Sequence, residues 1–275
     1  MLDLWRRLPA FVRAVLACLA VLVLGGQPWQ VLLALNFQFA PSVPWCVPLG
    51  LVWLAIVWSW LRGRGPPAST RAARRASLRA ERVSATTWVA TLAIGVVGWC
   101  GLLLLEIALF RALGVPKSAP FPPELSITSA LAFALLAALG AGVIEESAFR
   151  GVLQRPLESR HGPFAAITVS SACFLLAHAG QYGGRLDLLL FNAWYYLGAG
   201  ALFGFLAWSA GSILPGIVLH ALADLAGIAL AAWSAAASGD PLASVSAWLV
   251  PAGLACIAGA AVLGRRRVRS ARSVA

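Results

Sequence analysis

The stretch SITSALAFALLAALGAGVIEESAFRG, residues 126–151, joins a long apolar run to two adjacent carboxylates, Glu145 and Glu146, and to Arg150. Such a run is long enough to cross the hydrocarbon core of a membrane, which takes about 20 apolar residues. A charged side chain at membrane depth costs at least about 2.5 kcal/mol on insertion scales, so an ionisable residue there indicates a functional site. We therefore expect this segment to carry the chemistry of the protein.

The composition of the whole chain fits a polytopic membrane protein. Of its 275 residues, 60% are hydrophobic and only 11% are charged. We expect an all-α transmembrane helical bundle of about eight spans, at residues 11–25, 43–61, 87–110, 126–144, 163–180, 188–208, 213–236 and 242–263. We divide the chain into N-terminal helices with a basic loop at 62–86 (residues 1–125), a core (126–236), and a last helix with a basic tail (237–275).

The net charge of +11 would suggest nucleic-acid binding in a soluble protein, but its distribution predicts a membrane topology instead. With a cytoplasmic N-terminus, only Arg111, Lys117 and Arg185 of the 21 Lys and Arg lie outside, which leaves 18 inside. Basic residues near helix ends resist translocation. We therefore expect cytoplasmic termini, no nucleic-acid partner, and a loop 62–86 that forms a surface helix or flexible linker on anionic headgroups.

The residues that carry chemistry fall in the second half of the chain. Of the three histidines, His178 and His220 lie within predicted spans, and His161 lies in a predicted loop. Three pairs have a spacing of four residues and so share a helix face: Glu146 with Arg150, Phe174 with His178, and His220 with Asp224. An ion pair with Arg150 would neutralise Glu146. Glu145, about 100 degrees further around the helix, would be free to act as a general base.

A structural alternative exists for His220 and Asp224, because a buried hydrogen-bonded pair can simply hold two membrane helices together. The recurrence of the same spacing in all three polar pairs favours a shared site instead. The depths of the residues present a difficulty, since Glu145 falls near the end of its span and His178 lies about 15 residues into the next. We therefore expect the helix of Glu145 to continue through Arg150 towards Arg155.

In this order, over about residues 130–227, the motifs Glu-Glu-x-x-x-Arg, Phe-x-x-x-His and His-x-x-x-Asp resemble those of the CAAX prenyl protease and bacteriocin-processing (CPBP, or Abi) family of intramembrane endopeptidases. The resemblance implies a catalytic core at 126–236 and an active-site cavity between the fourth, fifth and seventh helices. There Glu145 and His178 would activate a water for attack on a peptide carbonyl. His220 and Asp224 would position the water or stabilise the oxyanion, and Glu146, Arg150 and Phe174 would support the site.

Asp224 departs from the family pattern, which commonly has asparagine at that place. An ionised aspartate cannot donate a hydrogen bond to an oxyanion. Asp224 is therefore protonated, or it orients His220, or it joins Glu145, His178 and His220 as a ligand of a divalent metal such as zinc. We expect a mechanism without a metal or other cofactor, and a metal-dependent mechanism is the alternative.

The expected substrate is a membrane-anchored peptide or protein, cleaved near its C-terminus in many relatives. An Arg-, Ala-, Leu- and Gly-rich chain with a single Met suggests a GC-rich bacterial genome, and hence the bacterial inner membrane. A proton-coupled transporter is one alternative, but the polar residues lie in one half only, without a matching pair of broken helices. A non-catalytic scaffold or bacteriocin-immunity protein is another, although all four expected catalytic positions are occupied.

Overall fold

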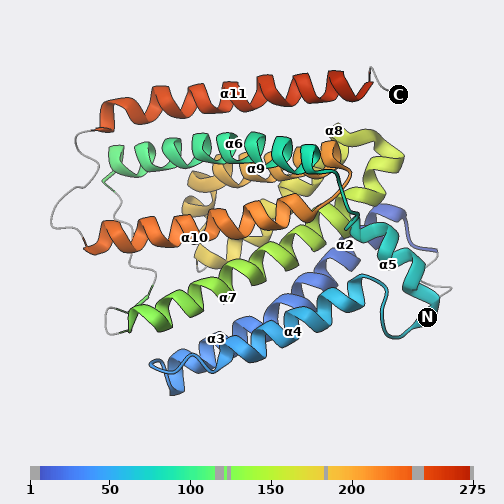
Figure 1. Ribbon diagram of the computed structural model, residues 1–275, viewed down its shortest axis with the longest axis horizontal. Helices are drawn as coiled ribbons and strands as arrows, with labels where there is room; N and C mark the ends of the chain where they lie inside the picture. Colours follow the sequence, from blue (N-terminus) through green and yellow to red (C-terminus); the bar gives the residue numbers. More distant parts are fainter. Residues whose placement is uncertain (1–6, 115–120, 123–124, 183–184, 237–244, 273–275) are drawn as a thin grey trace.

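The computed structural model describes residues 7–114, 121–122, 125–182, 185–236 and 245–272, and within them the chain is helical and has no strand. Most of the helices run side by side along the long axis of the molecule (Figure 1). In chain order the helical segments are α2 (Ala10–Ala20), η1 (Val21–Gly26), α3 (Gln27–Phe39), α4 (Cys46–Leu61), η2 (Ala68–Thr70), α5 (Arg71–Leu78), α6 (Ala85–Ala112), α7 (Ile127–Glu145), η3 (Glu146–Gln154), α8 (Arg155–Ala177), η4 (Ala179–Tyr182), α9 (Leu186–Ala210), α10 (Leu214–Ala236) and α11 (Ser246–Arg272). The predicted all-α bundle is confirmed.

The segments α7, η3 and α8 form one helical hairpin that folds back at Gly162. Gly162 has a φ of 78°, a left-handed conformation that favours glycine, and Pro163 after it disfavours a helical conformation at Gly162. The Ser170 hydroxyl donates to the Phe149 carbonyl at 3.1 Å, although these residues are 21 apart in sequence. In a straight helix they would be about 31 Å apart, so the chain must reverse between them.

This hairpin resolves the difficulty of depth. The helix does continue from Glu145 through η3 into α8, as expected. Glu145 lies 17 residues before Gly162, and His178 lies 16 residues after it. Since both limbs rise by about 1.5 Å per residue, the two side chains return to the same level.

Around the hairpin, α7 packs against α10 and α4, while α8 packs against α9, and α6 packs against α9 and α11 (Figure 1). Glycines permit the closest of these contacts, as small residues commonly do between membrane helices. A Cβ atom on Gly142 of α7 would lie 2.9 Å from the Ile217 carbonyl oxygen of α10. A Cβ atom on Gly200 of α9 would lie 2.8 Å from the Ser171 Cα of α8. The backbones of both helix pairs are therefore almost in contact.

The structure contains six helical stretches long and apolar enough to cross a membrane within the described residues. One of them is the hairpin Ile127–Ala177, which covers most of two predicted spans, and Cys46–Leu61 is a shorter apolar helix. The count of about eight spans stays a prediction. The predicted end of the first span at Gly25 is wrong, because a continuous stretch of 30 residues runs from Ala10 to Phe39. Pro28 falls in the first turn of α3, where a missing N–H is tolerated, and the π-helical η1 connects the two halves.

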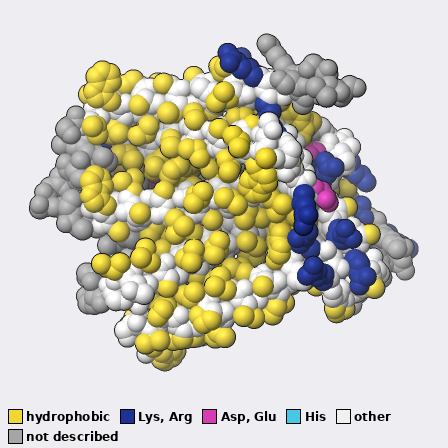
Figure 2. Space-filling model, in the orientation of Figure 1, with side chains coloured by type: hydrophobic (Ala, Val, Ile, Leu, Met, Phe, Trp, Pro, Cys, Tyr) yellow, Lys and Arg dark blue, Asp and Glu magenta, His cyan; other side chains and the backbone are white. Residues whose placement is uncertain are grey.

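Apolar side chains cover the broad face of the molecule, and Lys and Arg side chains gather at one end of it (Figure 2). The start of α2 and the end of α11 lie at this basic end (Figure 1). An apolar face (Figure 2) on a bundle of helices long and apolar enough to cross a membrane is the form of an integral membrane protein. The side of the membrane that the basic end faces stays a prediction.

The basic loop at 62–86 contains a short helix, as one of the two alternatives expected, and its location on anionic headgroups stays a prediction. It contains α5, on which Arg74 is 9% exposed and Leu78 only 1%. The Arg74 guanidinium donates to the carbonyl oxygens of Trp60 at 2.9 Å and Gly65 at 3.0 Å, and lies over the Trp60 ring. Leu78 packs against Gly151 in η3, so the loop contacts the helix that carries the two adjacent carboxylates.

Candidate active site

Two predicted site histidines lie close to the same carboxylate oxygen of a third predicted site residue, Glu145, and the three residues come from different helical segments. Glu145 ends α7, His178 directly follows α8, and His220 lies on α10. The Glu145 Oε2 atom is 4.0 Å from His178 Nε2 and 3.8 Å from His220 Nε2. The π-helical turn η3 starts immediately after Glu145, and such wide turns are frequent at functional sites. The arrangement brings one potential base and two imidazoles to a common point.

The His178 ring is held in a defined tautomer and orientation. Its Nδ1 atom is 2.8 Å from the Phe174 carbonyl oxygen. A carbonyl can only accept, so Nδ1 carries the proton, and in the neutral ring Nε2 presents its lone pair towards Glu145. The ring makes tilted contacts with Phe174, whose ring centroid is 4.5 Å away, and with Tyr196, whose ring centroid is 4.3 Å away. The predicted contact between Phe174 and His178 is therefore present.

His220 is fixed in a similar way, but by a carboxylate. Its Nδ1 atom donates to Glu146 Oε1 at 2.9 Å. Its Nε2 atom then lies 3.8 Å from Glu145 Oε2 and 3.9 Å from Asp224 Oδ2, beyond hydrogen-bond length. His220 and Asp224 do share a helix face, but the hydrogen-bonded partner of His220 is Glu146.

The expected ion pair between Glu146 and Arg150 is present at the base of the site. Arg150 Nη1 is 3.2 Å from Glu146 Oε1, and both side chains are 0% exposed. The guanidinium also donates to the Gly200 carbonyl oxygen at 3.4 Å. It lies within 6 Å of three phenylalanine rings, those of Phe149, Phe174 and Phe203. A buried pair of this kind is strongly destabilised when one partner is lost, since the other charge is left uncompensated.

The opposite side of the cluster is accessible. The Asp224 side chain is 37% exposed, Glu145 is 23% exposed and His178 is 12% exposed. Exposure thus rises from the buried Glu146–Arg150 pair towards Asp224. The Glu145 Oε2 atom that faces the two Nε2 atoms is itself buried and has no hydrogen-bond partner among the described residues. The predicted active-site cavity stays a prediction. The helices expected to enclose it correspond to α7, α8 and α10, which position Glu145, His178 and His220.

A second ionic network, not expected from the sequence, joins the basic loop to the same hairpin. The buried Arg79 forms an ion pair with Glu158 of α8, and Glu158 accepts a hydrogen bond from Gln154 Nε2 at 2.7 Å. Gln154 Nε2 also donates to the Gly204 carbonyl oxygen at 2.9 Å, and Ile213 N donates to the Arg79 carbonyl oxygen at 3.0 Å. Burial lowers the pKa of Arg79, and the hydrogen bond to Glu158 opposes this shift. The loop therefore ties η3 and α8 to α9 and to the start of α10.

Sequence reasoning missed two aromatic residues of α9. Tyr196 contacts the His178 ring, and the Phe203 ring centroid is 5.1 Å from that of His220. One signal for Tyr196 was available, because two of the three tyrosines in the chain, Tyr195 and Tyr196, are adjacent within one apolar span. Phe203 is one of 12 phenylalanines and had no distinguishing feature.

The comparison with family models agrees with the motifs. Residues 127–226 match the family model described as Type II CAAX prenyl endopeptidase Rce1-like. This segment is Rce1-like. It runs from the start of α7 to α10 and contains Glu145, His178 and His220 together with their partners Glu146, Arg150 and Asp224. No match was found among curated proteins or among solved structures.

Proposed function

We propose that the protein is an intramembrane endopeptidase that hydrolyses a peptide bond in a membrane-anchored peptide or protein. The observation that carries this proposal is the convergence of Glu145, His178 and His220 within an Rce1-like segment. Two imidazoles whose Nδ1 atoms are held by acceptors, and whose Nε2 atoms face one carboxylate, form a set suited to proton transfer.

In the proposed reaction, Glu145 accepts a proton from a water molecule positioned between it and His178. The resulting hydroxide attacks the scissile carbonyl carbon, and the carbonyl oxygen becomes an oxyanion. His220, oriented by Glu146, and Asp224 position the water or stabilise this oxyanion. The oxyanion then re-forms a carbonyl group as the carbon–nitrogen bond breaks, and the proton held by Glu145 passes to the leaving amine, so that two peptide fragments are released. Glu146 and Arg150 act by positioning these groups rather than by touching substrate.

The residues present do not form a good site for a resident metal. Two ligands on a tetrahedral zinc lie about 3.3 Å apart, given bonds of about 2.0 Å. The separations of 3.8 and 4.0 Å around Glu145 Oε2 are wider. Within the described residues, no group of three His, Cys, Asp or Glu is arranged to hold a metal ion. The proposed reaction therefore uses no metal ion. Loss of activity with a chelator and its return with zinc would favour the metal alternative.

The test compares protein termini in membranes from cells that carry the wild-type chain and cells that carry Glu145→Gln. New termini found only with wild type would support the endopeptidase and identify its substrate. Identical termini at equal protein levels would overturn the proposal and favour the proton-coupled transporter or the non-catalytic scaffold.

A further inference from the structure

A large apolar cavity lies between α2, α4, α5 and the η3–α8 hairpin, and it is distinct from the catalytic cluster. Its volume is about 820 Å³, and none of Glu145, His178 or His220 lines it. That volume falls within the range of about 300–1,000 Å³ of small-molecule sites. The cavity exists because α3 packs along α4 whereas α2 packs mainly against η3. Ala10, Ala14 and Ala17, spaced along one face of α2, leave the gap unfilled.

The cavity opens sideways towards the surface that faces lipid tails. Three apolar side chains on its rim are well exposed, Leu16 by 44%, Leu24 by 68% and Ile56 by 55%. Its inner end is formed by Gly25 and Val57. An apolar chain entering from the membrane would therefore contact hydrophobic side chains along its whole length.

Arginines from three separate elements line the basic end of the same cavity: Arg13 of α2, Arg74 of α5 and Arg160 of α8. Among the residues that the structure describes, the lining contains no Asp or Glu. Arg74 already donates to backbone carbonyls, whereas no carboxylate of the described residues forms an ion pair with Arg13 or Arg160. The hydroxyls of Thr70, Ser77 and Ser159 lie in the same lining.

We propose that this cavity binds one anionic glycerophospholipid, with an acyl chain along α2 and its phosphate at Arg13 and Arg160. Basic pockets between spanning helices on the cytoplasmic side are suited to anionic headgroups. A zwitterionic lipid would place its own cation among three guanidinium groups. A peptide in extended form would leave backbone N–H groups unpaired against the apolar wall.

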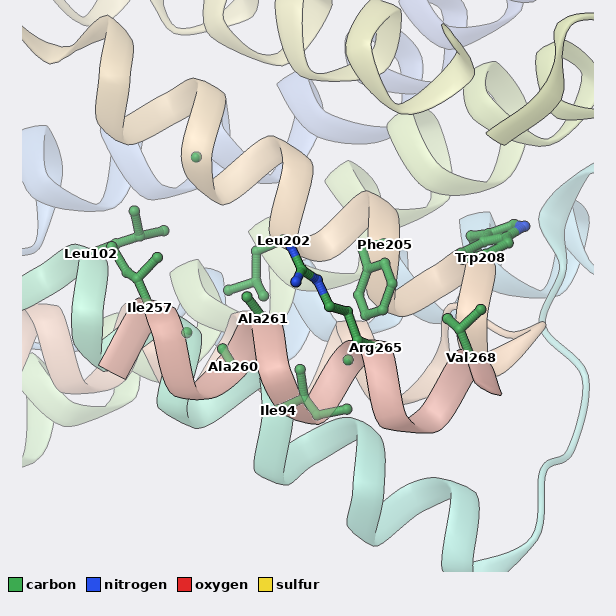
Figure 3. Close-up of a pocket in the computed structure, with 13 residues that line it drawn as sticks. Ile94, Leu102, Leu202, Phe205, Trp208, Ile257, Ala260, Ala261, Arg265 and Val268 are labelled. Atoms are coloured by element: carbon green, nitrogen blue, oxygen red, sulfur yellow. The ribbon is translucent and has the colours of Figure 1, made fainter. Parts of the chain in front are cut away.

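A second groove in the bundle gives a useful contrast (Figure 3). It has a volume of about 550 Å³ and lies between α6, α9 and α11, and among the described residues its lining has one arginine, Arg265. In Figure 3 the Arg265 side chain extends beside Leu202 and Phe205. A single guanidinium gives less charge complementarity, so we assign the anionic lipid to the first cavity.

The bound lipid acts on the protein by holding α2 and the following η1 segment against α7 and η3. A Cβ atom on Gly25, at the inner end of the cavity, would lie 3.0 Å from Ile144 Cδ1, and Ile144 directly precedes Glu145. Val152 of η3 and Pro156 of α8 form the facing wall. Filling the cavity therefore stabilises the packing around η3, and removing the lipid loosens it.

The test measures thermal unfolding of the full-length protein, purified in a mild detergent, during titration with phosphatidylglycerol. We expect a saturable rise in Tm with phosphatidylglycerol and none with phosphatidylcholine or glycerol 1-phosphate, since the first lacks a net negative charge and the second lacks acyl chains. In Arg13→Gln/Arg160→Gln, binding of phosphatidylglycerol should weaken about 25-fold, about fivefold for each basic residue lost.

The matched control is Arg62→Gln/Arg265→Gln, which removes the same charge outside this cavity and should bind phosphatidylglycerol as the wild type does. Equal stabilisation of the Arg13→Gln/Arg160→Gln variant and the wild type would overturn the proposal. Equal stabilisation by phosphatidylcholine would contradict the proposal that the bound lipid has an anionic headgroup. Neither outcome depends on peptidase activity, so the lipid site and the proposed function can fail separately.

Discussion

Glu146 makes two contacts that the rest of the site depends on. It pairs with the buried Arg150 at 3.2 Å and accepts from His220 Nδ1 at 2.9 Å. The chain also leaves room for it, since a Cβ atom on Gly216 would lie 3.2 Å from Glu146 Oε2. Its neighbour Glu145 has a different environment, because its side chain is 23% exposed and its Oε2 atom lies near the two Nε2 atoms. Adjacent residues of one type therefore have separate roles.

The two glutamates should respond differently to the same substitution. Glu146→Gln leaves the Arg150 charge buried without a counter-charge, and loss of one partner of a buried pair costs about 3–5 kcal/mol. We expect a clearly lower Tm and a lower yield for Glu146→Gln, measured by thermal unfolding in detergent. Glu145→Gln, the matched control, should unfold at the wild-type temperature. Equal Tm values for the two variants would contradict the assigned roles.

Asp224 is the site residue that departs from the pattern of the family that the motifs resemble, which commonly has asparagine there. It is 37% exposed and lies 3.9 Å from His220 Nε2, too far for a hydrogen bond. We expect Asp224→Asn to keep most of the activity, because an amide retains the shape and can donate to an oxyanion. Asp224→Ala should lose about tenfold or more, in line with a lost polar group near an oxyanion.

Rates of substrate cleavage by the two Asp224 variants, measured at equal protein levels, check this expectation. An Asp224→Asn protein as inactive as Asp224→Ala would show that the negative charge itself is needed. That result would favour the metal alternative, in which Asp224 is a ligand.

At the level of helices, the contact between α7 and α10 sets the distance from Glu145 and Glu146 to His220. Gly142 lies one turn before the two glutamates, and its backbone faces Ile217 and Ala221 of α10. Any side chain there must move α10, because the nearest atoms are backbone atoms that cannot rotate away. Ile217 lies three positions before His220 on the same helix, so the displacement would reach the imidazole directly.

Gly142→Leu should therefore reduce activity strongly, by about 100-fold, since a displacement of 1 Å at a catalytic site can cost that factor. The control is Gly227→Leu on α10, where a Cβ atom would meet nothing within 4 Å. Cleavage rates at equal protein levels distinguish them. Full activity of Gly142→Leu would show that α10 is not held by this contact.

The sequence allowed prediction of the helices of the core but not of their reversal. The spacing of four residues in the pairs Glu146–Arg150 and Phe174–His178 predicted contacts that the structure contains, because these pairs depend only on local helix geometry. The hydrogen bond from His220 to Glu146 joins residues 74 apart and depends on how α10 packs on α7. The alignment of Glu145 with His178 depends on the positive φ of Gly162, where the chain reverses. The composition cannot tell which of the 26 glycines adopts this conformation.

At the level of the whole molecule, the charge distribution agrees with the packing. The basic side chains gather at one end of the apolar bundle (Figure 2), and α5, the start of α2 and the end of α11 lie there. The basic loop reaches the hairpin through Arg79 and Glu158, so this end is also ordered by an internal ion pair. The positive-inside rule predicts that such an end lies in the cytoplasm.

A topology measurement tests this orientation. Green fluorescent protein fused after the C-terminal residue should fluoresce, and alkaline phosphatase fused at the same place should be inactive, because the basic tail of α11 would stay in the cytoplasm. The opposite pair of results would reverse the orientation of the entire bundle. It would also place the accessible side of the site differently relative to the two compartments.

The most direct test of the central claim is oxygen transfer from water to a new peptide C-terminus. Membranes that contain the wild-type chain or Glu145→Gln are incubated in H₂¹⁸O, and peptide termini are then analysed by mass spectrometry. We predict new C-termini that carry ¹⁸O with the wild type, and their absence with a correctly inserted Glu145→Gln protein. The same labelled termini in both samples would contradict the role of Glu145, and no labelled termini in either would contradict hydrolysis by this protein.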